Sequence, residues 1–217
     1  MKRIAVLALQ GGFEPHAAML DQLGHDVFEA RTAADIERAD GLVLPGGESS
    51  VQLLLIGRFG LEPAIRAVVT SGRPILATCA GAILSAANVA SPEQRSFGFV
   101  DIDVVRNAYG RQRDSFEATS DAGRNAKDGR GAGTFDGLPL VFIRAPRIVR
   151  VGPSVEILAA FSGEPILVRQ GNVTAATFHP ELTADGRVHR DVFGGHRAAK
   201  PCDAGGVVPC PSNISMS

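Results

Sequence analysis

The stretch PILATCAGAILSAAN, residues 74–88, predicts a strand that turns directly into a helix. Pro74–Thr78 is a short apolar run typical of a buried strand, and Ala80–Asn88 is rich in the small and aliphatic residues of a helix. Cys79 stands at the turn, with small residues two positions before and two positions after it, as a tight strand-to-helix turn requires. The stretch therefore presents a cysteine at the carboxyl end of a predicted buried strand.

The chain before this stretch repeats the alternation of strand and helix. The expected strands are Ile4–Leu9, Asp26–Ala30 and Gly41–Leu44, and the expected helices are Phe13–Leu23, Ala33–Ala39 and Leu61–Ser71. This alternation predicts a three-layer α/β fold, with a mostly parallel central sheet and helices on both faces. Sheets of this kind place ligands at the carboxyl ends of their strands.

The second half of the chain is richer in strands. The expected strands there are Phe99–Arg106, Ser115–Thr119, Leu140–Ile143, Val155–Phe161, Pro165–Arg169 and Val173–Phe178. Few helical patterns separate them, so an antiparallel or mixed extension of the sheet is expected. A last helix begins at Val188–Phe193 and is interrupted by two glycines. We expect residues 1–193 to form a single domain and residues 194–217 to be a flexible tail.

Composition excludes several classes of protein. The 217 residues carry 22 basic and 23 acidic side chains, a formal net charge of −1, and 45% of them are hydrophobic. This suits one domain with its own core, whereas nucleic-acid binding needs a clustered basic surface. The longest uncharged stretch, Pro74–Pro92, contains polar residues and has proline at both ends, which favours a buried strand and helix over a membrane span. The three cysteines form no CxxC pair, so we expect a cytoplasmic protein without a bound metal.

A histidine and an acid follow the last expected strand, in the segment TFHPE at residues 177–181. Glu181 can reach back to one nitrogen of His179 and leave the other nitrogen free to face the thiol of Cys79. A parallel sheet would bring the two strand ends to the same edge. Taken alone, however, Cys79 also fits a buried structural cysteine, and His179 fits a surface or core histidine.

The segment PGGESS, residues 45–50, comes directly after the expected strand Gly41–Leu44. Consecutive glycines leave backbone amides free to donate to an oxyanion or a carboxylate, although two glycines after a strand are also a common turn. The amide of Ala80 points toward an oxyanion on an attacked carbonyl, and the start of its helix stabilises a thiolate at Cys79. The sequence contains no phosphate loop of the GxxxxGK[ST] type, so ATP use is not indicated.

Six motifs together resemble the glutaminase subunits of pyridoxal 5′-phosphate synthase, which are class I (triad) glutamine amidotransferases. In chain order they are LALQG (residues 7–11), PGGESS (45–50), ATCAG (77–81), RNAYGRQRDSFEA (106–118), FIRAP (142–146) and FHPELT (178–183). They are distributed over nearly the whole chain before the tail. The resemblance implies a flavodoxin-like fold and the hydrolysis of L-glutamine to L-glutamate and ammonia, without a cofactor.

The resemblance also implies roles for particular residues. Cys79 would attack the side-chain amide of glutamine, His179 would move the protons, and Glu181 would orient His179. The oxyanion would be held by the backbone amides of Gly47 and Ala80. Glutamine itself would be bound by Gly47, Glu48, Ser49, Arg106, Ile143 and Arg144.

The resemblance further implies a protein partner. The ammonia would pass to a synthase subunit built as a (β/α)₈ barrel, in a multi-copy complex, and Gln10 and Gly11 would lie near that interface. A glutaminase that serves another biosynthetic synthase is one alternative, which RNAYGRQRDSFEA disfavours. The other alternative is a catalytically silent scaffold with the same cysteine turn, which the pairing of His-Pro-Glu with PGGES disfavours.

Three features depart from the family pattern. Ala82 stands where a larger aliphatic residue commonly follows TCAG, which is expected to loosen the packing beneath the cysteine turn. The glycine-rich loop 121–133 looks longer than usual. After Phe193 the chain runs into glycines where the family continues a helix.

Overall fold

The computed structural model of the chain describes residues 1–106, 115–121 and 134–194. Its centre is a seven-stranded sheet in the order β10-β11-β12-β4-β3-β1-β2. The five parallel strands are β1 (Arg3–Leu7), β2 (Asp26–Ala30), β3 (Gly41–Leu44), β4 (Ile75–Thr78) and β12 (Val173–Ala176). Two antiparallel strands, β10 (Glu156–Phe161) and β11 (Glu164–Gln170), extend the sheet beyond β12.

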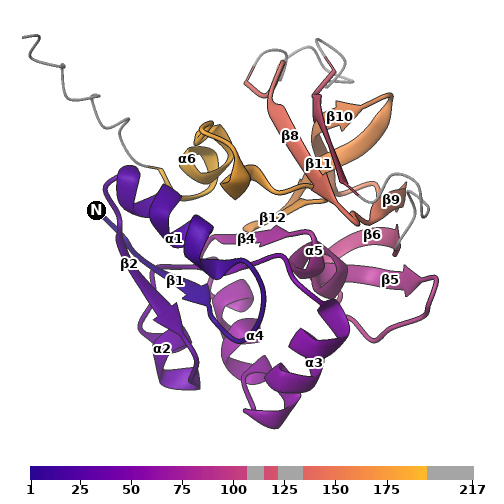
Figure 1. Ribbon diagram of the computed structural model, residues 1–217. Coiled ribbons are helices and arrows are strands. Elements are labelled where there is room, and N and C mark those ends of the chain that lie inside the picture. The colour runs from indigo at the N-terminus through magenta and orange to yellow at the C-terminus, as the bar shows by residue number, and fades with distance from the viewer. Residues whose placement is uncertain (107–114, 122–133, 195–217) are drawn as a thin grey trace, which may run out of the picture.

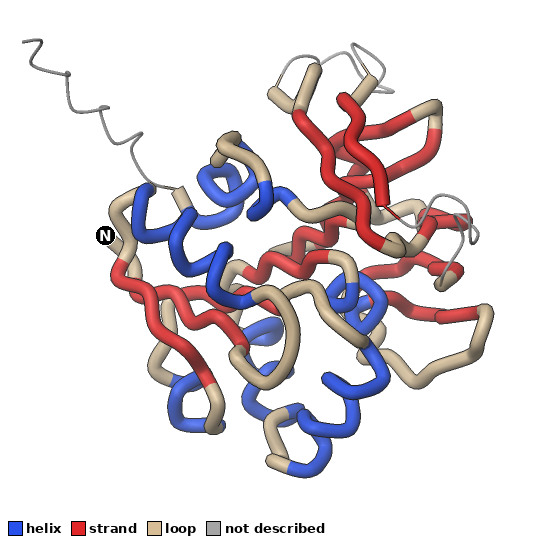
Figure 2. Tube along the Cα trace, in the orientation of Figure 1, coloured by secondary structure: helices blue, strands red, loops and turns tan. Residues whose placement is uncertain are grey.

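Helices cover both faces of this sheet, as Figures 1 and 2 show. On one face lie α1 (Phe13–Gln22) and α6 (Arg187–Phe193), and on the other lie α2 (Ala33–Glu37), α3 (Ser49–Arg58), α4 (Glu62–Thr70) and α5 (Ala80–Ser85). The expected three-layer α/β fold with a mixed extension is therefore confirmed.

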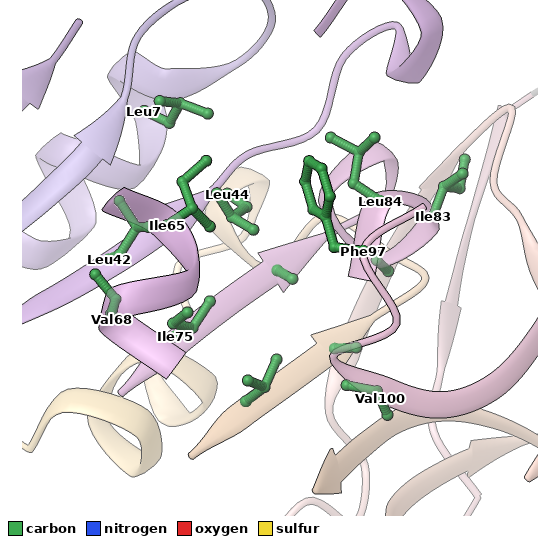
Figure 3. Close-up of a cluster of buried hydrophobic side chains, with 14 of the residues drawn as sticks. Leu7, Leu42, Leu44, Ile65, Val68, Ile75, Ile83, Leu84, Phe97 and Val100 are labelled. Atoms are coloured by element: carbon green, nitrogen blue, oxygen red, sulfur yellow. The ribbon is translucent and has the colours of Figure 1, made fainter. Parts of the chain in front are cut away.

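The core is divided by the alternation of side chains along each strand. Ala5 and Leu7 of β1 join the apolar cluster beneath α4 and α5, whereas Ile4 and Val6 join the cluster beneath α1 and α6. Figure 3 shows the first cluster, in which Ile65 of α4 lies close to the leucines of β3. All four residues of β3, and likewise of β4 and β12, are buried, as expected of parallel strands with helices on both sides.

Two smaller sheets complete the described part of the chain. One contains β5 (Ala86–Ala90), β6 (Val100–Val105) and β9 (Arg147–Val151), and the other pairs β7 (Ser115–Thr119) with β8 (Pro139–Ile143). None of the helices in the described ranges is both long and apolar enough to cross a membrane.

One secondary-structure prediction was partly wrong, and two further elements were not predicted. The helix expected over Ala80–Asn88 ends at Ser85, because the next five residues form β5 and pair with β6. Helix α3 was not expected; it begins in PGGESS because the Glu48 carboxylate caps it, accepting from the amides of Ser50 and Val51. Strand β9 was also not expected, and its place is determined by antiparallel pairing with β6.

Some sequence-based expectations lie outside the described residues. Residues 122–133 of the glycine-rich loop and residues 195–217 of the tail are among them. A single domain over residues 1–193 stays a prediction. Ala82 itself is fully buried in the cluster shared by α4 and α5.

Candidate active site

Cys79 occupies a strained turn between β4 and α5. Its backbone has φ +47° and ψ −100°, a region that residues other than glycine rarely adopt. The turn is held because the Cys79 N–H donates to the carbonyl of Ala176 at the end of β12, at 2.8 Å. Helix α5 also approaches β3 so closely that a Cβ on Gly81 would lie 2.1 Å from the Leu44 carbonyl oxygen. Only small residues allow this geometry, and the Cys79 side chain is left 6% exposed.

His179 reaches the same edge of the sheet from β12. The two strands are parallel and in register, with Ala176 opposite Thr78, so both chains leave the sheet side by side. Past the end of β12, the His179 N–H donates to the carbonyl of Val141 at 2.8 Å, which fixes the backbone there. His179 Nδ1 lies 2.7 Å from Glu181 Oε1.

The environment of His179 favours its protonated form. Burial alone would lower its pKa, but hydrogen bonds and charge interactions with Cys79 and Glu181 raise the pKa to about 10. The structure thus brings together the three side chains of Cys79, His179 and Glu181, although 100 residues separate the cysteine from the histidine. A thiol, an imidazole and an orienting carboxylate in contact can perform nucleophilic attack on a carbonyl carbon.

The glycine pair of PGGESS packs directly against this site. A Cβ on Gly46 would lie 2.4 Å from His179 Cε1 and 3.4 Å from Cys79 Cβ. The Gly46 carbonyl accepts from the Gly12 N–H at 3.1 Å and from Gln52 Nε2 at 3.4 Å. Because the N–H and C=O of a peptide unit point in opposite directions, the Gly47 N–H is directed away from the Gly12 side.

Glu48 and Arg106 form an ion pair beside the glycines. Arg106 Nη2 donates to Glu48 Oε1 at 2.9 Å and to Ser50 Oγ at 3.3 Å. Partial burial opposes ionisation of Glu48, but the amides of Val51 and Ser50 and the charge of Arg106 lower its pKa below the ordinary value. Arg106 is the one residue of RNAYGRQ that lies within the described ranges.

The other predicted substrate residues, Ser49, Ile143 and Arg144, differ in their surroundings. The Ser49 hydroxyl is buried and donates to Gln94 Oε1 at 2.9 Å, so it is already engaged. The Ile143 carbonyl oxygen lies 3.9 Å from Cys79 Sγ, which brings the FIRAP segment to the thiol. Arg144, the next residue, is exposed and has φ +44°.

Gln10 and Gly11 contact the glycine loop, residues 45–50. Gln10 Oε1 accepts from the Glu48 N–H at 2.8 Å, and Gln52 Nε2 donates to the Gln10 carbonyl at 2.9 Å. Gly11 has φ +104°, and a Cβ there would lie 1.9 Å from the Gly46 carbonyl oxygen, so no other residue fits.

Sequence reasoning did not identify Gln52 or His16 as part of this region. Gln52 is buried on α3, where a glutamine among apolar residues was a detectable signal. His16 stands in α1 among the apolar positions that defined the helix, and it lies 3.3 Å from Glu181 Oε2. Among the described residues, no group of three or more His, Cys, Asp or Glu side chains is arranged to hold a metal ion.

Comparisons with known proteins agree with this geometry. The model of the SNO glutamine amidotransferase family matches residues 6–194. The pyridoxal 5′-phosphate synthase subunit PdxT of Koribacter versatilis is 49% identical over 187 residues, which cover 86% of this chain and 92% of the relative. The subunit of the same name from Shouchella clausii is 45% identical over 188 residues, with 87% and 92% covered.

Solved structures give the same result. A crystal structure of a glutamine amidotransferase has a TM-score of 0.77 and 40% sequence identity, covering 87% of this chain and 96% of that one. The structure of PurLQS from Thermotoga maritima has a TM-score of 0.64 at 15% identity, with 88% and 98% covered. The latter likeness concerns the fold alone.

Proposed function

This chain belongs to the SNO glutamine amidotransferase family, and from that premise we propose that Cys79, His179 and Glu181 are its catalytic triad. The chain is the glutaminase subunit of a pyridoxal 5′-phosphate synthase and hydrolyses L-glutamine to L-glutamate and ammonia. The observation that carries the triad is the contact of His179 with both the thiol of Cys79 and the carboxylate of Glu181.

In the first half of the reaction, the Cys79 thiolate attacks the side-chain carbonyl carbon of glutamine and forms a carbon–sulfur bond. The amides of Gly47 and Ala80 stabilise the resulting oxyanion, and loss of one such donor typically costs about 10²–10³ in rate. His179 donates a proton to the departing nitrogen, the carbon–nitrogen bond breaks, and ammonia leaves behind a thioester. The raised pKa of His179 keeps this proton available at neutral pH.

In the second half, water attacks the thioester. His179, now neutral, accepts a proton from that water, the carbon–sulfur bond breaks, and glutamate and the Cys79 thiolate are released. Glu181 holds His179 Nδ1 throughout, so that the other ring nitrogen faces the reacting atoms. The cycle consumes one water and needs neither a cofactor nor a metal.

Glutamine presents an α-carboxylate and an α-ammonium group. We propose that Arg106 and Arg144 attract the carboxylate, that Glu48 attracts the ammonium group, and that Gly47, Ser49 and Ile143 contribute to the pocket. The ion pair of Arg106 with Glu48 supports this, because it places charges of both signs next to the glycine loop.

The finer description of the partner is also a proposal. We infer that ammonia passes to a (β/α)₈-barrel synthase subunit in a multi-copy complex, in the cytoplasm, with Gln10 and Gly11 near the interface. Gln10 is partly exposed and Gly11 is exposed, which leaves both accessible to a partner. Because Gln10 holds the Glu48 amide, a contact there is mechanically connected to the glycine loop.

The test is release of ammonia from glutamine, measured with and without the synthase subunit. Cys79→Ala is expected to abolish the activity. Glu181→Gln is expected to retain part of it, because the general base His179 stays in place. Activity that survives Cys79→Ala would exclude the thiol mechanism. Binding of both variants to the synthase subunit serves as the control for folding.

A further inference from the structure

Two histidines that the reaction above does not use lie buried behind Glu181. His16 belongs to α1 and His189 to α6, the two helices that cover one face of the sheet (Figure 1). Both residues are 0% exposed, and their ring centroids are 5.1 Å apart. His16 Nδ1 lies 2.9 Å from His189 Nε2, a hydrogen bond between groups that are 173 residues apart in the chain.

The other nitrogen of His16 faces the proposed catalytic acid. His16 Nε2 lies 3.1 Å from Thr78 Oγ1 and 3.3 Å from Glu181 Oε2. The Glu181 carboxylate therefore has one imidazole at each oxygen, His179 at Oε1 and His16 at Oε2. Oε2 makes no hydrogen bond of regular geometry within the described residues, so the polar contact with His16 is what compensates the burial of this oxygen.

Both histidines of the pair are neutral near pH 7. Burial lowers the pKa of His189 to about 3, and it lowers the pKa of His16 well below its ordinary value, helped by the nearby His189 and His179. Three other groups face the pair: the carboxylate of Glu181, the imidazole of His179 and the hydroxyl of Thr78.

The positions of the protons follow by elimination. An ionised carboxylate only accepts, and a bare ring nitrogen 3.3 Å from it would set two lone pairs against each other, so the N–H of neutral His16 is on Nε2. This N–H donates to Thr78 Oγ1 and lies in polar contact with Glu181 Oε2. The bare Nδ1 of His16 then accepts from the Nε2–H of His189, which leaves His189 Nδ1 without a proton. His189 Nδ1 is buried without a hydrogen-bond partner, which is less costly for a lone pair than for an N–H.

We propose that His16 is a positioning residue for Glu181, and that His189 acts through His16 by holding it in the tautomer that places an N–H, and not a lone pair, beside the carboxylate. The proposal rests on the triad proposed above. It extends the line of contacts to Cys79–His179–Glu181–His16–His189, in which α1 and α6 orient the catalytic acid from the side opposite His179. A buried chain of hydrogen bonds and polar contacts of this kind restricts the carboxylate to one orientation.

The experiment compares two amides at position 16 in the full chain bound to its synthase subunit. In His16→Gln the amide nitrogen reaches about as far as Nε2 and can still place an N–H between Thr78 and Glu181, whereas the shorter side chain of His16→Asn cannot. His16→Asn is expected to lower kcat for glutamine about 10–100-fold with little change in KM, because misorientation of a catalytic group costs rate and not substrate binding. His16→Gln is expected to recover most of that loss.

A second readout reports directly on the triad. Alkylation of Cys79 by iodoacetamide, followed by mass spectrometry of the Cys79 peptide because the chain also contains Cys202 and Cys210, gives the pH dependence of the thiolate. His16→Asn is expected to shift this pH profile, and His16→Gln to restore it. The matched control is His25→Asn, at a buried histidine whose Nε2 bonds the Gly194 carbonyl at 2.8 Å, which should leave kcat and the profile unchanged.

The role of His189 is tested by a double-mutant cycle. If His189 acts only through His16, adding His189→Leu to His16→Asn costs no further activity, although His189→Leu alone does. Additive losses would overturn the proposed chain. Unchanged kcat and an unchanged alkylation profile in folded His16→Asn would overturn the role of His16, whereas ammonia release by Cys79→Ala would instead overturn the triad on which it rests.

Discussion

At the scale of single residues, the site depends on a glycine, which has no side chain, as much as on the side chains of the triad. Gly46 lies between the imidazole of His179 and the turn at Cys79. Its carbonyl is tied to the Gly12 N–H and to Gln52, so the backbone cannot easily move away from the site. Any added carbon at this position therefore competes with the imidazole for the same space.

Gly46→Ala is accordingly expected to lower kcat about 100-fold while the protein stays folded. The new Cβ would lie 2.4 Å from His179 Cε1 and 3.0 Å from its Nδ1, which displaces the ring from both of its partners. Ammonia release in the presence of the synthase subunit measures the effect. Gly12→Ala is the control, since nothing lies within 4 Å of a Cβ there; equal activities in the two variants would contradict the packing described.

At the scale of elements, the turn at Cys79 depends on the close approach of α5 to β3. The helix has only six residues, and all of them are buried. Gly81 is the contact point, where the helix backbone meets the Leu44 carbonyl. The position of the Cys79 thiol is thus determined by the packing of a helix against a neighbouring strand, in addition to the strand that precedes it.

Gly81→Ala is expected to destabilise the protein by about 2–3 kcal/mol, because the added carbon cannot be accommodated without moving α5. Gly57→Ala in α3 is the matched control: it is also a helical glycine, nothing lies within 4 Å of its Cβ, and alanine there should stabilise by up to about 1 kcal/mol. Urea unfolding of both variants provides the comparison. A neutral effect at residue 81 would mean that α5 is free to move from β3.

At the scale of the whole molecule, the buried histidines make stability depend on pH in two opposite directions. Unfolded histidines take up protons near pH 6.5, but folded His189 does so only near pH 3, and His16 also well below 6.5. Between these values the unfolded state binds more protons, so acid favours unfolding. Folded His179 instead keeps its proton up to about pH 10, so its contribution, fully present below pH 6.5, is lost as the pH rises toward 10.

The free energy of unfolding is therefore expected to be highest near pH 6.5–7. At pH 5 the loss from His189 alone is about 2 kcal/mol, which is the difference of 1.5 pH units below 6.5 at roughly 1.4 kcal/mol each. Urea midpoints measured from pH 5 to pH 9 check this expectation. His189→Gln removes one titrating group and should flatten the acid side; equal slopes for both proteins would refute the assignment.

Local patterns were sufficient for most of the sheet. The strands Asp26–Ala30 and Gly41–Leu44 have the predicted bounds. Gly41–Leu44 is a continuous apolar run buried on both sides, which leaves a local signal, whereas Asp26–Ala30 is a partly exposed strand at the edge of the sheet. Helix α3 escaped prediction because Leu54 is 69% exposed and Val51 41%, so its apolar residues do not form a single buried stripe. Strand β5 escaped because its pairing with β6, and not its own residues, makes it a strand.

The sequence by itself determined the fold class and the family, and it singled out a thiol, an imidazole and a carboxylate with the residue types of a triad. These follow from motifs of a few neighbouring residues, whose spacing is visible in the chain. Only the tertiary structure decided that Gly46 packs against His179, and that His16 and His189 meet behind Glu181. Contacts between residues far apart in the chain are produced by the packing of α1 and α6 on one face of the sheet, and such packing leaves no periodic pattern in the residues that it brings together.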